Sequence, residues 1–299
     1  MANNLKVIID ANALAWKAKH SLKDLSTDEL KVGVIFGFMN QILKIATDYN
    51  TNDISFCWDS KTSKRQNIFP AYKERRRTLK EDKTPEEIEE DKLTYAQFDQ
   101  LYAEILPLLG VVNNYKIDGY EGDDLIASIV YSNSDDDLII ASGDEDMFQL
   151  LMEGVSILRT RVNKRGKREY YLFTEAMFIE EYGIEPILWA AVKAIAGCKS
   201  DEVPGIKGVG ESSALDFLKN NLTPNHKRYQ SITCPEGKDI INRNRKLVTL
   251  PFKGCPVIVL KKQGSWSFEG FISVCQTYDF RSMLNKETLA KWKENLKLK

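Results

Sequence analysis

The sequence predicts an α/β fold in which a mostly parallel central sheet is flanked by helices. Three short apolar runs rich in β-branched residues, at 5–9, 54–58 and 137–141, have the length and composition of buried strands. Amphipathic helical segments separate these runs, and each run ends within a few residues of a carboxylate. Because open α/β sheets bind ligands at the carboxyl ends of their strands, we expect the functional site along that edge.

The composition excludes several classes of protein. A chain of 299 residues with a formal charge of −1 can contain one large domain or two. Five scattered cysteines without a C-x-x-C pair argue against a disulfide scaffold or a zinc site, and only two histidines argue against a Ser/His/Asp hydrolase. The sequence contains no signal peptide and no uncharged run of about 20 residues, so we expect a cytoplasmic protein with no membrane contact.

The first third of the chain places two aspartates at strand ends. The strand at 5–9 is followed by Asp10 and Asn12, and the strand at 54–58 is followed by Asp59. Between them, an apolar repeat at helical spacing predicts one long helix from about residue 26 to residue 49. Aspartate is common in turns, so two such strand ends could be coincidental, whereas a third one, before Asp144, makes coincidence a poor explanation.

A strongly basic segment follows Asp59. Residues 61–80 carry eight basic side chains against one acid, a local charge of +7, with Phe69 and Tyr72 among them. Basic residues mixed with aromatic ones suit a phosphate backbone and stacked bases, although a solvated charged loop is the alternative. The basic residues are Lys61, Lys64, Arg65, Lys73, Arg75, Arg76, Arg77 and Lys80.

An acidic helix comes next. Thr84 followed by Pro85 predicts a capped helix start, and apolar residues at helical spacing continue to Gly110. Because residues 61–92 are highly charged and poor in core residues, we expect them to project from the body of the protein. Val111 and Val112 are a candidate edge strand.

Two groups of acids open helices in the centre of the chain. Glu121, Asp123 and Asp124 precede an apolar helix at 125–131, while Asp144 and Asp146 follow the strand at 137–141 and begin another helix. One acid would suffice to cap each helix, for about 0.5–2 kcal/mol. Further unpaired carboxylates about 4 Å apart would repel by roughly 1–4 kcal/mol per pair. The excess of acids therefore favours a bound cation over capping alone.

A glycine-rich turn stands out in the second half of the chain. We expect a hairpin at 155–173, helices at 174–183 and 186–197, and then Gly205, Gly208 and Gly210 between two helices. A dinucleotide-binding fingerprint would need a strand before the glycines, so a helix-hairpin-helix whose N–H groups face a DNA phosphate is the better interpretation. Beyond residue 221 we expect a strand-like piece at 251–260 and a terminal helix at 286–299.

Taken together, these motifs resemble the structure-specific 5′ nucleases, the flap endonuclease family. The resemblance covers about residues 5–220 and follows the order of that family's motifs. It implies a PIN-like nuclease core at 1–182 that includes a helical arch at about 65–95. It also implies a helix-hairpin-helix DNA-binding region with a helical C-terminal part at 183–299. The motifs are the strand ending at Asp10, Trp58-Asp59 with Arg65 and 70–73, residues 119–124, residues 142–151, and residues 197–210.

The same resemblance implies a set of site residues. Lys73 and Arg76 would meet the scissile phosphate, and Arg65, Tyr72 and the three glycines would join them in contacting DNA. A K⁺ ion would lie at the hairpin. Two or more Mg²⁺ or Mn²⁺ ions would be held by Asp10, Asp59, Glu121, Asp123, Asp124, Asp144, Asp146 and Asp201.

One position departs from the family pattern. Cys198 stands where relatives carry Asp, and we expect the second metal site to bind its ion more weakly. A water could replace the lost ligand, or the soft thiolate could shift the preference away from Mg²⁺. Glu202, where relatives carry Asn, could partly compensate.

The implied function is a metal-dependent 5′ nuclease in replication or repair. It would remove 5′ flaps from branched DNA and trim 5′ ends, with RNA–DNA hybrids as further substrates. The expected partners are DNA and a polymerase or single-strand-binding protein, and the expected setting is a monomer in a bacterial or phage-infected cell. One alternative is a junction-binding protein whose metal site no longer supports hydrolysis. Another is a related phosphatase or RNase, which would not explain the basic arch and the glycine turn.

Overall fold

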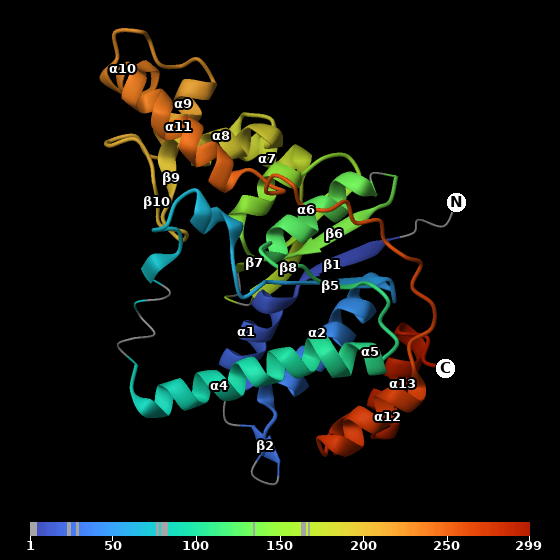
Figure 1. The fold of residues 1–299 in the computed structure, drawn as a ribbon. Helices are drawn as coiled ribbons and strands as arrows, with labels where there is room; N and C mark the ends of the chain where they lie inside the picture. Colours follow the sequence, from blue (N-terminus) through green and yellow to red (C-terminus); the bar gives the residue numbers. More distant parts are fainter. Residues whose placement is uncertain are drawn as a thin grey trace.

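A six-stranded sheet forms the centre of the computed structural model, which describes residues 5–22, 25–27, 30–75, 78, 83–133, 135–162, 166 and 168–299 (Figure 1). The strand order is β5-β4-β1-β6-β7-β8, and all strands run parallel except β8, which pairs antiparallel with β7. The predicted fold class is therefore confirmed. The strands are β1 (Lys6–Asp10), β4 (Ile54–Trp58), β5 (Asn114–Lys116), β6 (Leu138–Ala141), β7 (Val155–Val162) and β8 (Arg168–Thr174).

Helices cover both faces of this sheet. Side chains alternate between the faces of a strand, so Val7 and Ile9 enter one hydrophobic cluster while Ile8 enters the other. The hydrophobic cluster with Val7 and Ile9 lies under α1 (Ala11–Leu22) and α2 (Gly33–Tyr49). The hydrophobic cluster with Ile8 lies under α6 (Gly122–Ser132), α7 (Glu175–Tyr182), η4 (Pro186–Leu188) and α8 (Trp189–Ala196).

The predicted helix at 26–49 is wrong at its start. Two short antiparallel strands, β2 (Ser26–Thr27) and β3 (Leu30–Lys31), precede a helix that begins only at Gly33. Gly33 lies against the end of α1, where a Cβ atom would come within 2.0 Å of the Leu22 carbonyl oxygen. Only glycine lets the two helices meet this closely.

The acidic helix begins and ends as the sequence predicts. Thr84 Oγ1 accepts a hydrogen bond from the Glu87 N–H, and the Thr84 N–H donates one to Glu87 Oε2. Together they form a capping box at α4 (Pro85–Gln100). One π-helical turn, η2 (Leu101–Ile105), and α5 (Leu106–Leu108) extend it to Gly110. The candidate edge strand at Val111-Val112 is displaced, because the strand found here is β5, two residues later.

The expected arch is described only in part. η1 (Lys64–Asn67) and a run of turns lead to Arg75, and the chain is described again without interruption from Lys83. Arg76, Arg77 and Lys80 lie outside the described residues, so the closed arch stays a prediction.

Three helices form a lobe beyond the sheet (Figure 1). They are α9 (Glu211–Leu218), α10 (Lys227–Thr233) and α11 (Pro235–Val248), and α11 packs along α8. A small hairpin of β9 (Gly197–Cys198) and β10 (Val203–Pro204) connects α8 to the turn that contains Gly205, Gly208 and Gly210.

The strand-like piece expected at 251–260 belongs to no sheet in the described structure. Its backbone lies along α6 and is held by side chains. The Ile258 N–H donates to Ser128 Oγ at 3.1 Å, and the Leu260 N–H donates to Asn133 Oδ1 at 3.1 Å. These hydrogen bonds replace a strand ladder, which is why an extended apolar run here is not a strand.

The last helices return to the first part of the chain. Trp266, Phe271 and Trp292 are buried in the same cluster as α2, and Trp266 Nε1 donates to the Asn52 carbonyl at 3.0 Å. These helices are α12 (Phe268–Thr277) and α13 (Lys286–Asn295), with η5 (Arg281–Met283) between them. The division between residues 182 and 183 stays a prediction. Within the described residues, no helix combines the length and the apolar character needed to span a bilayer.

Candidate functional site

Four aspartates from distant parts of the chain converge at the carboxyl edge of the sheet. Asp10 ends β1, Asp59 follows β4, Asp123 lies in the first turn of α6 and Asp144 follows β6. The negative charges of Asp59 and Asp144 both act on Asp10, and all three act on Asp123. We call Asp10, Asp59, Asp123 and Asp144 the first cluster. The first cluster therefore lies at the strand ends, the edge where the sequence predicts the site.

Hydrogen bonds hold these carboxylates in place. The Ala13 N–H donates to Asp10 Oδ1 at 2.9 Å, and Ser142 Oγ donates to Asp10 Oδ2 at 3.2 Å. The Gly122 N–H donates to Asp59 Oδ1 at 2.8 Å. Ligands oriented in this way before an ion arrives bind it with less loss of entropy.

The charges of the first cluster are unfavourable without a cation. Removal from water, followed by the neighbouring charge of Asp59, raises the pKa of Asp10 to about 7. Removal from water and the charges of Asp10 and Asp144 also raise the pKa of Asp123 well above its usual value. Four oxygen-bearing side chains that repel one another fit a hard divalent cation. The capping alternative therefore explains only part of this arrangement.

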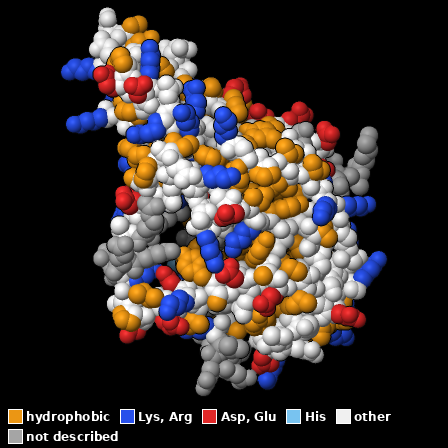
Figure 2. Space-filling model, in the orientation of Figure 1, with side chains coloured by type: hydrophobic (Ala, Val, Ile, Leu, Met, Phe, Trp, Pro, Cys, Tyr) orange, Lys and Arg blue, Asp and Glu red, His pale blue; other side chains and the backbone are white. Residues whose placement is uncertain are grey.

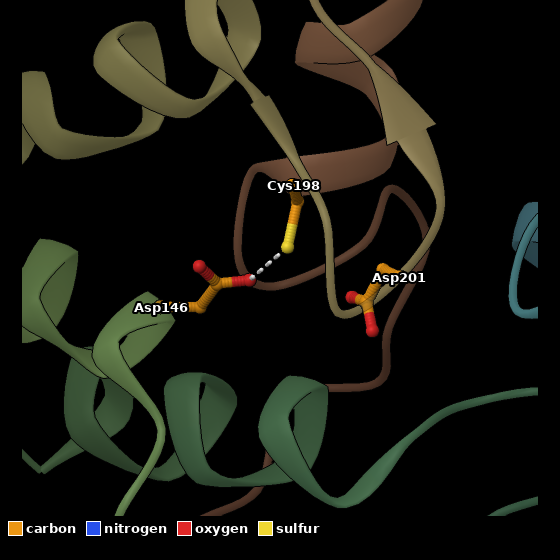
Figure 3. Close-up of side chains that lie close together, drawn as sticks. All are labelled: Asp146, Cys198 and Asp201. Carbon is orange, nitrogen blue, oxygen red and sulfur yellow. Dashed lines mark hydrogen bonds between the residues drawn. The ribbon is translucent and has the colours of Figure 1, made fainter. Parts of the chain in front are cut away.

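A second cluster adjoins the first. It consists of Asp146 in η3 (Glu145–Leu150), Cys198 in β9 and Asp201, with one ligand atom of each within 4.8 Å of the others (Figure 3). Removal from water and the charges of Asp144 and Asp201 raise the pKa of Asp146 to about 7. Asp144, a member of the first cluster, therefore acts on the second cluster as well.

Lys73 supplies a positive charge beside the second cluster. Its Nζ lies 2.7 Å from Glu121 Oε2 and 3.4 Å from Asp201 Oδ1. The Tyr72 hydroxyl lies 3.0 Å from Glu121 Oε2 and 3.1 Å from Asp201 Oδ2, so it can donate to either oxygen. Burial alone would raise the pKa of Glu121, but the charges of Lys73 and Arg65 bring it down to about 2. Glu121 is therefore an ionised carboxylate paired with Lys73.

Asp124 does not face either cluster. Its side chain is fully buried, and Arg65 binds it through two contacts, Nη1 to Oδ2 at 2.7 Å and Nη2 to Oδ1 at 2.8 Å. The N–H groups of Phe252 and Glu121 donate to the same two oxygens. Four donors leave Asp124 without capacity for an ion, so its expected role as a metal ligand is replaced by a structural one.

The residues expected to contact DNA divide into three groups. Arg65 and Tyr72 are 3% and 2% exposed, so neither can meet a phosphate from where it lies. Arg76 lies outside the described residues. Gly208 and Gly210 have open space where a side chain would point, whereas Gly205 packs against Ala196, whose carbonyl a Cβ atom would approach to 2.1 Å. Of these three glycines, Gly208 and Gly210 therefore leave room for a ligand to approach the backbone, and Gly205 does not.

Two features near the site have no local signal in the sequence. Lys193, on α8, interacts electrostatically with Asp146 and Cys198. No sequence motif indicates this lysine. A cavity of about 430 Å³ borders Ser142, and its lining includes Lys17, Lys44 and Tyr170. Five separate segments build this cavity, so no local pattern could have indicated it.

The raised pKa values predict how stability depends on pH. An acid whose pKa is higher in the folded state binds its proton more tightly there, so folding stability falls as pH rises from about 4 towards 7. We expect the melting temperature of metal-free protein to fall between about pH 5 and pH 7.5, and Mn²⁺ to raise it most at the upper pH. Calorimetry with and without a chelator tests this; equal Mn²⁺ effects at both pH values would contradict it.

Comparisons with known proteins identify relatives of this chain. Residues 6–183 match the family described as the 5′-3′ exonuclease, N-terminal resolvase-like domain. The thermostable DNA polymerase I of Thermus aquaticus is 30% identical over 217 residues, which are 71% of this chain and 23% of that protein. The chain thus spans about a quarter of the length of that polymerase. A Bacillus subtilis 5′-3′ exonuclease is 29% identical over 75% of this chain and 72% of its own.

A solved structure shares the fold at low sequence identity. The bacteriophage T5 flap endonuclease, in a complex with DNA and metal ions, superposes with a TM-score of 0.67 at 19% identity. The match covers 98% of this chain and 99% of that one. The lobe and the C-terminal helices therefore belong to the shared fold as well as the sheet.

Proposed function

The chain belongs to the 5′-3′ exonuclease family, and on that basis we propose that it is a metal-dependent nuclease that hydrolyses DNA at 5′ flaps and 5′ ends. The observation that carries this proposal is the convergence of carboxylates from four segments of the chain on one edge of the sheet. A protein that only bound DNA would gain nothing from this cluster of anions, since DNA phosphates are negative too.

The carboxylates divide into two proposed ion sites. Asp10, Asp59, Asp123 and Asp144 would hold one Mg²⁺ or Mn²⁺ ion, and Asp146, Asp201 and Glu121 would serve the second together with Cys198. When bound, such ions lower the pKa of an attacking water and neutralise charge on the phosphate. Ser142 and the Ala13 N–H keep Asp10 oriented for this task.

DNA would bind across the site and the lobe. Lysine and arginine side chains gather on the lobe (Figure 2), where Lys227, Arg228, Arg245 and Lys246 are exposed. We propose that this surface holds duplex phosphates. Backbone N–H groups near Gly208 and Gly210, together with a K⁺ ion at the glycine turn, would contact the same phosphates.

RNA–DNA hybrids are proposed as further substrates. The proposed setting is replication or repair in the cytoplasm of a bacterial or phage-infected cell. A polymerase or single-strand-binding protein is a proposed partner of the monomer.

Cleavage assays on three DNA molecules test the proposal. We expect Mg²⁺ or Mn²⁺ to support cutting of a 5′-flap substrate and of gapped DNA, while closed-circular DNA, which has no 5′ end, stays intact. Equal cutting of the closed circle would contradict the proposed nuclease function.

Cys198 in the second cluster favours one alternative, a junction-binding protein with a weakened metal site. That alternative predicts tight flap binding without cutting in either metal.

Lys73 is expected to act on the phosphate once ions neutralise its carboxylate partners. Lys73→Ala should lower the rate of cleavage at saturating DNA by about 100- to 1000-fold, as expected for loss of one charged donor at a reacting group. Lys73→Arg should recover part of the rate. Single-turnover cleavage of the flap substrate measures this.

If Lys73 had only a structural role, Lys73→Ala would lose stability and keep its rate of cleavage. In metal-free protein, Lys73→Ala removes the positive partner of Glu121 and Asp201 and should lower the melting temperature. With Mn²⁺ bound, the melting temperatures of the variant and the wild type should converge. A rate that is unchanged in Lys73→Ala would remove Lys73 from the reaction.

A further inference from the structure

A thiol stands between two carboxylates in the second cluster. Figure 3 shows the side chains of Asp146, Cys198 and Asp201 around a common space, with Asp146 from η3 and the other two from the β9–β10 hairpin. Cys198 Sγ lies 4.0 Å from Asp146 Oδ2, and all three donor atoms lie within 4.8 Å of one another. One ion could therefore be shared by a sulfur and two oxygens.

The hairpin fixes the position of the sulfur. Cys198 pairs with Val203 across β9 and β10. Gly197 precedes it with φ +84°, at a place where a Cβ atom would lie 2.4 Å from the Gly205 nitrogen. The Asp201 carbonyl accepts a hydrogen bond from the Lys73 N–H at 3.0 Å, which anchors the far side of the turn. A ligand carried by such a constrained element needs little rearrangement to bind an ion.

Packing alone does not explain the thiol. Cys198 is 5% exposed and belongs to a small apolar cluster with Val203 and Leu247. Its sulfur nevertheless has polar neighbours, Ser200 Oγ at 3.0 Å and Asp146 Oδ2 at 4.0 Å. An apolar filler would have no reason to point at a carboxylate.

The donor set discriminates between metals. Mg²⁺ requires oxygen ligands in a near-ideal octahedron and gains little from sulfur. Zn²⁺ and Co²⁺ bind thiolate and carboxylate together and accept tetrahedral geometry. A sulfur in place of a third oxygen therefore changes which ion the site prefers, in addition to how tightly it binds.

We propose that Cys198 is a metal ligand and makes the second cluster a mixed sulfur–oxygen site that selects Zn²⁺ or Co²⁺ over Mg²⁺. The inference rests on the proposed function for the presence of a metal centre, and it adds the class of ion that one half of that centre takes. The first cluster, built from carboxylates alone, keeps the preference for Mg²⁺ or Mn²⁺.

Co²⁺ absorption tests this directly, because a sulfur-to-cobalt charge-transfer band in the near ultraviolet appears only when a thiolate binds the ion. Reduced, metal-free full-length protein titrated with Co²⁺ should show this band, and excess Mg²⁺ should not remove it. Cys198→Ser should lose the band and bind Co²⁺ at least about 10-fold more weakly. Cys198→Asp should also lose the band, while its Mg²⁺ affinity rises.

Cys234, a second thiol of the chain, provides the matched control. Cys234 caps α11 and accepts a hydrogen bond from the Gly237 N–H at 3.4 Å, a role that serine can fill. Cys234→Ser should keep the full band. A band that is absent from the wild type, or that persists in Cys198→Ser, would overturn the proposal.

This test is independent of nuclease activity. If the band depends on Cys198 but no metal supports DNA cleavage, the proposed function fails and the metal assignment stands. If DNA is cleaved and no Cys198-dependent band forms, the function stands and the assignment fails. Circular dichroism of the two Cys198 variants verifies that a lost band does not reflect unfolding.

Discussion

Asp144→Ala should lower the rate of flap cleavage at least about 1000-fold, which corresponds to about 4 kcal/mol in the activation barrier. The charge of Asp144 acts on Asp10 and Asp123 in the first cluster and on Asp146 in the second. Its removal therefore weakens both proposed ion sites. DNA binding should be unchanged or tighter, since the variant has one negative charge fewer near the phosphates. Single-turnover cleavage and a flap-binding titration in Ca²⁺ measure the two effects.

Two further variants separate charge from structure at this position. Asp144 Oδ1 accepts a hydrogen bond from the Asp146 N–H at 2.8 Å, which caps η3. Asp144→Asn can still accept that hydrogen bond, so it should fold like the wild type and remain inactive. Asp135→Ala removes an exposed acid before β6 and should cleave normally. An active Asp144→Asn would remove the ionised carboxylate from the proposed mechanism.

Arg65→Ala should lower the free energy of unfolding by about 3–5 kcal/mol, because it leaves the buried charge of Asp124 without its partner. The guanidinium binds both oxygens of Asp124, and its Nε donates to the Leu247 carbonyl at 2.7 Å. It also lies over the Phe252 ring, 5.1 Å from the ring centre. Urea unfolding of metal-free protein gives the free energy.

The partner and a surface neighbour control this measurement. Arg65→Ala combined with Asp124→Ala should cost less than the two single substitutions added together, because neither charge is then left alone. Arg65→Lys should recover little, since an ammonium cannot bind both oxygens at once. Lys61→Ala, at an exposed side chain, should change stability by about 0.5 kcal/mol or less. Stability unchanged in Arg65→Ala would contradict the pairing.

The sequence was a sound guide to the strands and to the edge where the acids meet. β1, β4 and β6 are buried on both faces, so their sequences are mostly apolar, and strand direction alone brings Asp10, Asp59 and Asp144 together. These predictions depend on local composition and on the geometry of parallel sheets, both of which a single sequence contains.

Other features depend on contacts between distant residues and could not be read locally. Asp124 and Asp123 are adjacent acids, and only the fold decides that one faces the cluster while the other binds Arg65. α1 was not predicted because its buried residues, apart from Leu14, are alanines, which give a weak apolar pattern. The run at 251–260 has the composition of a strand, but Ser128 and Asn133 hold its backbone instead.

The packing of α12 and α13 against α2 has a consequence for biosynthesis. The hydrophobic cluster under α1 and α2 is completed by Trp266, Phe271 and Trp292, which come from the last part of the sequence. The chain must therefore leave the ribosome as far as Trp292 before α2 is fully covered. Until then, apolar surface around Phe36, whose ring lies 5.1 Å from that of Phe280, stays uncovered, and chaperones that bind nascent chains would find it.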